Sequence, residues 1–156
     1  MNIRVVWQQP IPLKDGASRG FIYVVSDPKA IPERPGVYTF ARRFGDTVSP
    51  LYIGQARNLK LRIDQQLNNV KLMMGIQNAQ AGERIVLVGE LSLQPGQQVP
   101  RVLDVVENAL IELALVNEYE LLNKQGRHTP FHSISFEGNT SSHHIAPARM
   151  RVRQGG

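Results

Sequence analysis

The chain has 156 residues, 42% of them hydrophobic, which suits a single domain with its own core. It contains no cysteine, which excludes disulfides and thiolate metal sites, and no apolar run is long enough for a membrane-spanning helix. The amino-terminal residues are too polar for a secretory signal, so we expect a cytoplasmic protein with no membrane partner, and the net charge of +5 is compatible with a polyanion.

The first part of the chain predicts strands separated by polar and proline-rich breaks. Short strands are expected at 3–7 and 21–25. Residues 37–41 alternate and are rich in β-formers, 44–50 contain Gly, Asp and Ser, and 51–53 follow as a return strand. This order predicts a β-hairpin.

After the hairpin, the apolar spacing changes from strand to helix. Gly54 is expected to end the return strand, and Asn58 has the side chain of an N-cap. Helical spacing over 59–78 predicts a helix that is broken near Gly75. The continuous apolar run 85–91 predicts a further strand.

The clearest helix is predicted at 100–123, with Pro100 in its first turn and Gly126 just past its end. Residues 133–137 are expected to form a last short strand. The predicted fold is α/β (α+β): one domain over 1–156, with a small mixed β-sheet and an N-terminal hairpin flanked by helices. The apolar stripe of the long helix is expected to comprise Val102, Val105, Val106, Ala109, Leu110 and Leu113.

Two tyrosines, Tyr38 and Tyr52, lie on the two strands of the predicted hairpin. Aromatic packing alone is one interpretation of this pair. The alternative is that both hydroxyls reach one surface, where a phenol can orient a water molecule or accept its proton.

Basic residues follow the hairpin. Arg57, Lys60 and Arg62 form a patch beside Gly54 at the start of the next helix. The patch is either a solvated helix face or a phosphate contact, for which a guanidinium fork is suited.

Glu107 lies on the long helix among Leu103, Leu110 and Ile111. It is either a glutamate at the boundary of the apolar face or a carboxylate that points into a cleft. In the second case it would suit a hard cation such as Mg²⁺, which prefers oxygen ligands.

Together these residues resemble the GIY-YIG nuclease superfamily. The first motif is Gly36-Val37-Tyr38 and the second is an intact Tyr52-Ile53-Gly54. Arg62 stands where the family keeps its arginine, Glu107-Asn108-Ala109-Leu110-Ile111 matches the glutamate helix, and Asn123 matches the closing asparagine. The resemblance runs from Arg34 to Lys124.

The resemblance implies a DNA endonuclease that uses one divalent ion, Mg²⁺ or Mn²⁺. It implies that Glu107 holds the metal, that Tyr38 orients or deprotonates the attacking water, and that Tyr52 supports it. Arg62 would stabilise the phosphate and Asn123 would brace the site. Gly36 and Gly54 would leave backbone room beside the tyrosines, next to Arg57 and Lys60.

The match to the family has departures. Gln66 stands where several relatives carry a histidine, and the segment 68–84 lengthens the interval between arginine and glutamate. Asn117 competes with Asn123 for the asparagine role. The catalytic core is expected over 34–126, with 1–33 and 127–156 as family-specific extensions.

Three functions remain open from the sequence. The first is a metal-dependent DNA endonuclease, which allows a homodimer as well as an inhibitor protein if the chain is a toxin. The second is an inactive nucleic-acid-binding module on the same fold, which the glutamine at position 66 favours. The third is an unrelated α/β domain whose tyrosines only pack.

Overall fold

The computed structural model describes residues 1–124 and 131–153. The chain divides into two compact units, Met1–Asn123 and Lys124–Gly156. Among the described residues, none of the helices is both long and apolar enough to cross a membrane. The first unit contains every candidate site residue.

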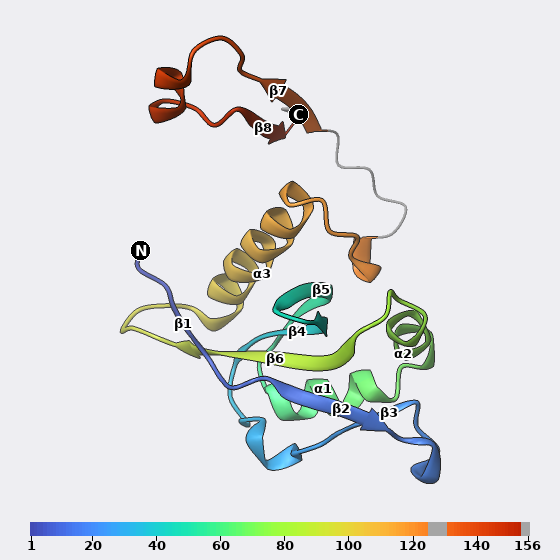
Figure 1. Ribbon diagram of the computed structural model, residues 1–156. Coiled ribbons are helices and arrows are strands. Elements are labelled where there is room, and N and C mark those ends of the chain that lie inside the picture. The colour runs from blue at the N-terminus through green and yellow to red at the C-terminus, as the bar shows by residue number, and fades with distance from the viewer. Residues whose placement is uncertain (125–130, 154–156) are drawn as a thin grey trace. The chain divides into compact units, whose positions relative to one another are not determined.

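The first unit is built on an antiparallel sheet (Figure 1). The strand order is β3-β2-β6-β4-β5, and β1 also pairs with β6. All these pairings are antiparallel, so the prediction of mixed strand directions was wrong, although the α+β class is confirmed. The strands are β1 (Arg4–Trp7), β2 (Ile11–Asp15), β3 (Tyr23–Val25), β4 (Gly36–Phe44), β5 (Thr47–Ala56) and β6 (Glu83–Ser92).

The predicted hairpin is present as β4 and β5, and it is longer than expected. Its turn is tight, with Gly45 at φ 60°, and β5 continues past Gly54 to Ala56. The register slips by one residue after Phe40, so that Leu51 is a bulge residue without a cross-strand partner. The bulge lets Leu51 and Tyr52 both pack against the same core cluster.

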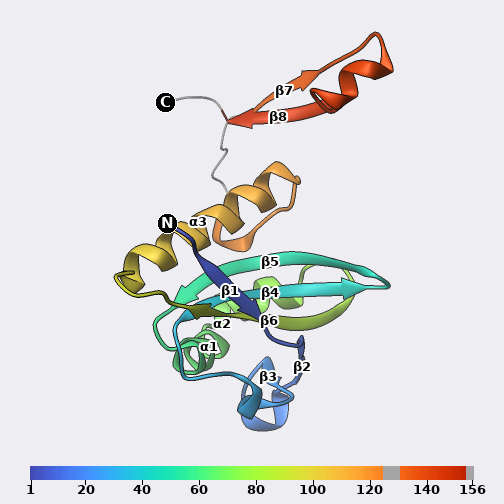
Figure 2. The same ribbon diagram turned by 90° about the vertical axis from the view of Figure 1, so that its left-hand side faces the viewer.

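Two helices cover one face of the sheet, and a third covers the other (Figures 1 and 2). The helices are α1 (Leu59–Leu67), α2 (Val70–Gln77) and α3 (Val99–Val116). The main core lies between the sheet and the α1–α2 layer, where Phe40, Ile63 and Met73 are fully buried. Each such side chain contributes about 1.5–3 kcal/mol by leaving water.

The helical region after the hairpin differs from its prediction in one respect. The Asn58 side chain accepts a hydrogen bond from the Leu61 amide, which confirms the N-cap. The break falls at Asn68 and Asn69 instead of Gly75, because the Asn69 side chain caps a new helix by accepting from the Leu72 amide at 3.1 Å.

The end of α2 is held by a buried arginine. Arg84, on β6, is 9% exposed, and its guanidinium donates to the carbonyls of Ile76, Ala79, Gln80 and Gly82 at 2.9–3.1 Å. These carbonyls belong to the helix end and the loop after it, where no helical donors remain. Arg84 therefore ties the α2 terminus to the central strand.

The long helix α3 is shorter than predicted. It ends at Val116, where Asn117 is the C-cap and Glu118 adopts a left-handed φ of 65°. Gly126, expected as the terminating glycine, lies outside the described residues. The buried stripe is also rotated, since Val105 and Leu113 are exposed; its buried members are Val102, Leu103, Ile111 and Ala114.

The second unit is a two-stranded ribbon with β7 (Phe131–Ser135) and β8 (Arg149–Arg153). The predicted strand at 133–137 corresponds to β7, two residues earlier, whereas β8 was not expected. Short 3₁₀ turns complete the described chain at Ala17–Arg19, Pro28–Ala30, Leu122–Lys124 and Thr140–His144.

Candidate active site

The two tyrosines lie on the same face of the β4–β5 hairpin. Tyr38 pairs with Gly54 and Phe40 pairs with Tyr52, which makes the two tyrosines diagonal neighbours across the strands. Their ring centroids are 6.2 Å apart, with 26° between the ring planes. Both rings pack in or against the main core cluster, as the packing interpretation expects, and both also line the cavity described below, as the alternative expects.

Glycine at position 54 is a steric requirement of this arrangement. An ideal β carbon at Gly54 would lie 2.5 Å from both Cζ and Oη of Tyr38. No real β carbon approaches another heavy atom so closely, so the phenol ring occupies the space above the glycine. The YIG glycine thus sets the position of the tyrosine on the opposite strand.

Gly36 lies where β4 packs tightly against β6 and α1. A β carbon there would lie 2.2 Å from the Gly89 carbonyl oxygen on β6 and 2.7 Å from a methyl group of Leu59. Gly36 does not line the cavity described below. Its position indicates close strand and helix packing rather than contact with a substrate.

Gln66 on α1 joins the two phenols. Its Nε2 donates to the Tyr38 hydroxyl at 2.7 Å and to the Tyr52 hydroxyl at 3.3 Å. Tyr38 is 1% exposed and Gln66 is 9% exposed, so this contact is largely shielded from water. Burial raises the pKa of Tyr38 above that of an ordinary phenol, while the bond from Gln66 and the nearby Arg62 partly oppose the shift.

A cavity of about 660 Å³ opens beside the phenols, at the end of β5. It brings together residues from three separate parts of the sequence: the hairpin, α1 and the first half of α3. Six predicted site residues line it: the four predicted catalytic residues Tyr38, Tyr52, Arg62 and Glu107, and the two predicted substrate contacts Gly54 and Arg57.

Two carboxylates reach the cavity from α3. Asp104 and Glu107 are three residues apart and therefore share one side of the helix. The Gln55 side-chain nitrogen donates to Asp104 Oδ1 at 2.8 Å and to Glu107 Oε2 at 2.9 Å. One amide thus holds both carboxylates toward the end of β5, which agrees with the cleft interpretation of Glu107.

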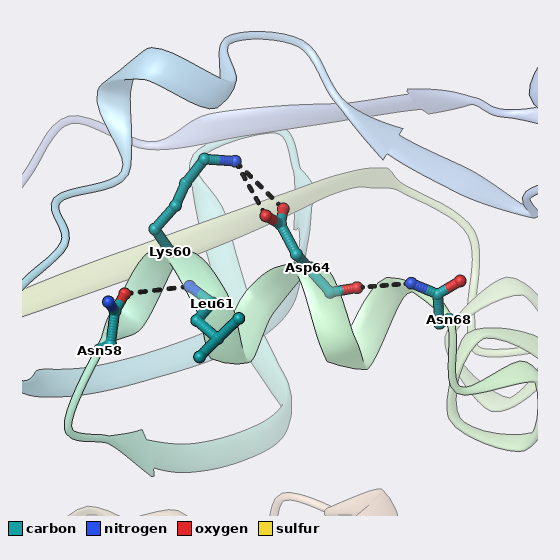
Figure 3. A network of polar contacts seen from close by, with 5 residues as sticks. All are labelled: Asn58, Lys60, Leu61, Asp64 and Asn68. Atoms are coloured by element: carbon teal, nitrogen blue, oxygen red, sulfur yellow. Dashed lines mark hydrogen bonds and ion pairs between the residues drawn. The ribbon is translucent and has the colours of Figure 1, made fainter.

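Lys60 is not among the residues that line the cavity. Its ammonium group contacts both oxygens of Asp64, one helical turn later, at 3.1 Å (Figure 3). Figure 3 also shows the Asn58 cap at the start of this helix. Of the three predicted basic residues, Arg57 and Arg62 face the cavity, and Lys60 forms an ion pair within α1.

Asn123 contacts the hairpin from outside the cavity lining. Its Nδ2 donates to the Ile53 carbonyl at 2.8 Å, in the middle of the YIG motif. Its Oδ1 is buried and has no hydrogen-bond partner within the part of the chain that the structure describes. Asn117, the alternative candidate, is the exposed C-cap of α3. The geometry of a brace therefore belongs to Asn123.

The donor set suits a hydrated hard cation. Asp104 and Glu107 are the carboxylates in the cavity lining, and Mg²⁺ typically binds one or two carboxylates while it keeps several waters. The described residues contain no group of three or more His, Asp or Glu side chains placed to hold a metal. The chemistry of the two oxygen donors fits Mg²⁺ or Mn²⁺.

Three members of this site are missed or undervalued by the sequence patterns: Asp104, Gln55 and Gln66. Asp104 has a usable signal, since it lies one turn before Glu107 on the same helix side. In the sequence, Gln66 stands out only as the residue that replaces a histidine. The contact of Gln55 with α3 is long-range, and no local pattern indicates it.

Comparisons with known proteins give no independent information about this cavity. No protein-family model, curated protein or solved structure matches the chain. The resemblance to the GIY-YIG superfamily therefore stays a hypothesis that rests on the residues themselves.

Proposed function

We propose that the chain is a divalent-metal-dependent endonuclease that hydrolyses phosphodiester bonds in DNA, of the GIY-YIG type. One observation supports this most strongly: a single cavity is lined by two phenols, a guanidinium and a carboxylate that are distant in sequence. The same four residues are those that the two motifs and their downstream spacing single out.

In this proposal Asp104 and Glu107 hold the cation. When bound, Mg²⁺ or Mn²⁺ would supply positive charge to neutralise the scissile phosphate and the leaving oxygen. Gln55 keeps both carboxylates on the cavity side of α3 by donating to each of them. Asn123 braces the strand that carries Tyr52 through the Ile53 carbonyl.

The remaining residues bind and orient the substrate. Arg62 lies in the cavity lining, where its fork matches two phosphate oxygens. An ordinary phenol is already protonated near neutral pH, and burial raises the pKa of Tyr38 further. Tyr38 therefore does not remove the proton of the attacking water, and because it is almost completely covered it acts through the adjacent Tyr52, whose partly exposed hydroxyl lines the cavity.

The ribbon of the second unit supports a polyanionic partner. Arg149 and Arg151 are two residues apart on β8, so they share one side of the strand. The opposite side carries Ile134, Met150 and Val152. Between 131 and 153 the sequence has one carboxylate, Glu137. A two-stranded ribbon with a basic side fits a DNA backbone or groove.

A supercoiled-plasmid assay tests the proposal. The parent protein should convert supercoiled to nicked or linear DNA with Mg²⁺ and should fail with EDTA. Glu107→Gln should lower the rate at least about 100-fold, since it removes an anionic ligand. Glu112→Gln, on the same helix and outside the cavity lining, should cleave like the parent. Equal rates for the parent and Glu107→Gln would refute the assignment.

The second candidate function is a nucleic-acid-binding module without cleavage. It is favoured by Gln66, which cannot exchange a proton near neutral pH as a histidine would. Salt-sensitive DNA binding with no metal-dependent nicking would select this function instead.

A further inference from the structure

The Gln66 amide imposes a direction on the hydrogen bonds of the phenol pair. Its nitrogen has two N–H groups, and both have an acceptor in reach, at 2.7 Å on Tyr38 and 3.3 Å on Tyr52. Each phenol oxygen therefore accepts from the amide. Each phenol also has one O–H of its own to donate.

These two O–H groups cannot both be used within the pair. The Tyr38 O–H has the Tyr52 hydroxyl as a neighbouring acceptor, an interaction that adds to burial in raising the pKa of Tyr38, and the Tyr52 O–H then has to find an acceptor elsewhere. Tyr52 is only partly buried, whereas Tyr38 is almost completely covered. The free O–H is therefore that of Tyr52, and the cavity is the space that Tyr52 lines.

The surroundings of this hydroxyl select an anionic acceptor. Arg57 and Arg62 line the same cavity and carry donors without acceptors. The two carboxylates of the lining, Asp104 and Glu107, come from α3 and are each held by Gln55. We infer that Gln66 is a positioning residue that directs the Tyr52 O–H, with the two arginines, onto a tetrahedral oxyanion such as a phosphate group. The identity of that anion as part of DNA rests on the proposed function.

Glutamine suits this task better than a titratable side chain. A neutral amide keeps its two N–H donors at every physiological pH, whereas an imidazole changes its donor pattern near its pKa. The direction of the hydrogen bonds in this chain is therefore independent of pH. The donors of this subsite all belong to the protein, so its phosphate binding can be measured in the absence of a metal ion.

Phosphate binding by the full chain tests the inference apart from cleavage. Inorganic phosphate would be titrated in EDTA and followed by ³¹P NMR, with Tyr52→Phe, Gln66→Met and the double variant. Tyr52→Phe should weaken binding about tenfold, the effect of one hydrogen bond to a charged group. Gln77→Met, on the exposed side of α2, should bind like the parent. Thermal melts would confirm that each variant is folded.

The double variant tests whether Gln66 acts through Tyr52. If Gln66 directs Tyr52, then Tyr52→Phe should cost less than about threefold once Gln66→Met is present, because the hydroxyl is no longer aimed. Equal costs in both backgrounds, or parent-like phosphate affinity for Gln66→Met, would overturn the inference.

A pair of charge-matched variants tests the donor direction itself. Gln66→Glu replaces the donor with an acceptor, to which the phenol O–H groups donate instead. Gln65→Glu adds the same charge to the cavity at the neighbouring, exposed position. Gln66→Glu should weaken phosphate at least about tenfold more than Gln65→Glu. Equal losses would mean that charge alone acts and that the amide does not donate. Plasmid nicking, measured separately, reports on the proposed function.

Discussion

Gly54 lies directly across the hairpin from Tyr38, and a β carbon on the glycine would fall 2.5 Å from the phenol carbon Cζ. The ring is thereby seated on the opposite backbone, with Gln66 at its hydroxyl. The Tyr38 ring can therefore take this position only because residue 54 has no side chain.

Gly54→Ala should displace the Tyr38 ring and cost about 1–3 kcal/mol of unfolding free energy, as overpacking does elsewhere. Urea denaturation measures this loss, and phosphate affinity should fall with it. Gly45→Asn in the same hairpin is the matched control, because φ is 60° there and a β carbon at that position would meet no atom within 4 Å. Its cost should stay within about 0.5 kcal/mol. An unchanged stability for Gly54→Ala would contradict the packing.

The buried phenol of Tyr38 predicts a loss of stability at alkaline pH. Its pKa is raised in the folded protein, whereas an unfolded phenol ionises near pH 10. The contribution of Tyr38 is therefore complete below about pH 10 and is lost as the pH rises above it, by at most about 1.4 kcal/mol per pH unit. Tyr38→Phe should show a shallower decline of unfolding free energy between pH 10 and 12. Parallel declines in the two proteins would argue against it.

Asp104 lines the cavity beside Glu107, and we expect it to contribute to cation binding in addition to Glu107. Asp104→Asn should weaken Mg²⁺ binding about tenfold, because the pair of oxygen ligands loses one charge. The measurement is the rise in melting temperature with added Mg²⁺, which needs no catalysis. Asp64→Asn, whose carboxylate pairs with Lys60 on α1, should leave that rise unchanged. A normal Mg²⁺ response in Asp104→Asn would leave Glu107 as the sole protein ligand.

The basic side of the ribbon predicts a change in salt dependence. Each phosphate contact contributes about 0.9 to the slope of log affinity against log salt on duplex DNA. The double variant Arg149→Gln, Arg151→Gln should lower that slope by up to about 1.8, with nicking chemistry at saturating DNA unchanged. Fluorescence anisotropy at several salt concentrations gives the slope. An identical slope would remove the ribbon from the DNA interface.

Local patterns predicted the parts of the fold that depend on neighbouring residues. Alternation and turn residues gave the β4–β5 hairpin, and the side chain of Asn58 marked the start of α1. The missed strand β2 contains Pro12, which removes an amide donor and weakens a strand signal. In β8, arginine alternates with apolar residues, and the charge of these arginines hides the strand pattern.

Helix ends were predicted least well, because tertiary contacts and side-chain caps set them. The apolar residues Leu121 and Leu122 extended the apparent periodicity of α3, yet the chain turns at Glu118. Gly75 suggested a break, but it packs against Leu122 inside α2, and Asn69 supplies the real start of that helix.

The sequence predicted the members of the candidate site that belong to motifs. It did not predict the members that join the site through long-range contacts. Tyr38, Tyr52, Arg62 and Glu107 were grouped by the resemblance to the GIY-YIG motifs, and they line one cavity. The contact of Gln55 with Asp104 spans 49 positions along the chain, and that of Gln66 with Tyr38 spans 28. Such pairs depend on how the helices pack on the sheet, which no local window contains.

The phenols and the carboxylates approach the cavity from opposite faces of the sheet, the former with α1 and the latter on α3. The cavity therefore exists only when both helix layers are docked on the sheet. A change that loosens α3 alone would separate the carboxylates from the phenols while it leaves the core cluster beneath α1 and α2 in place.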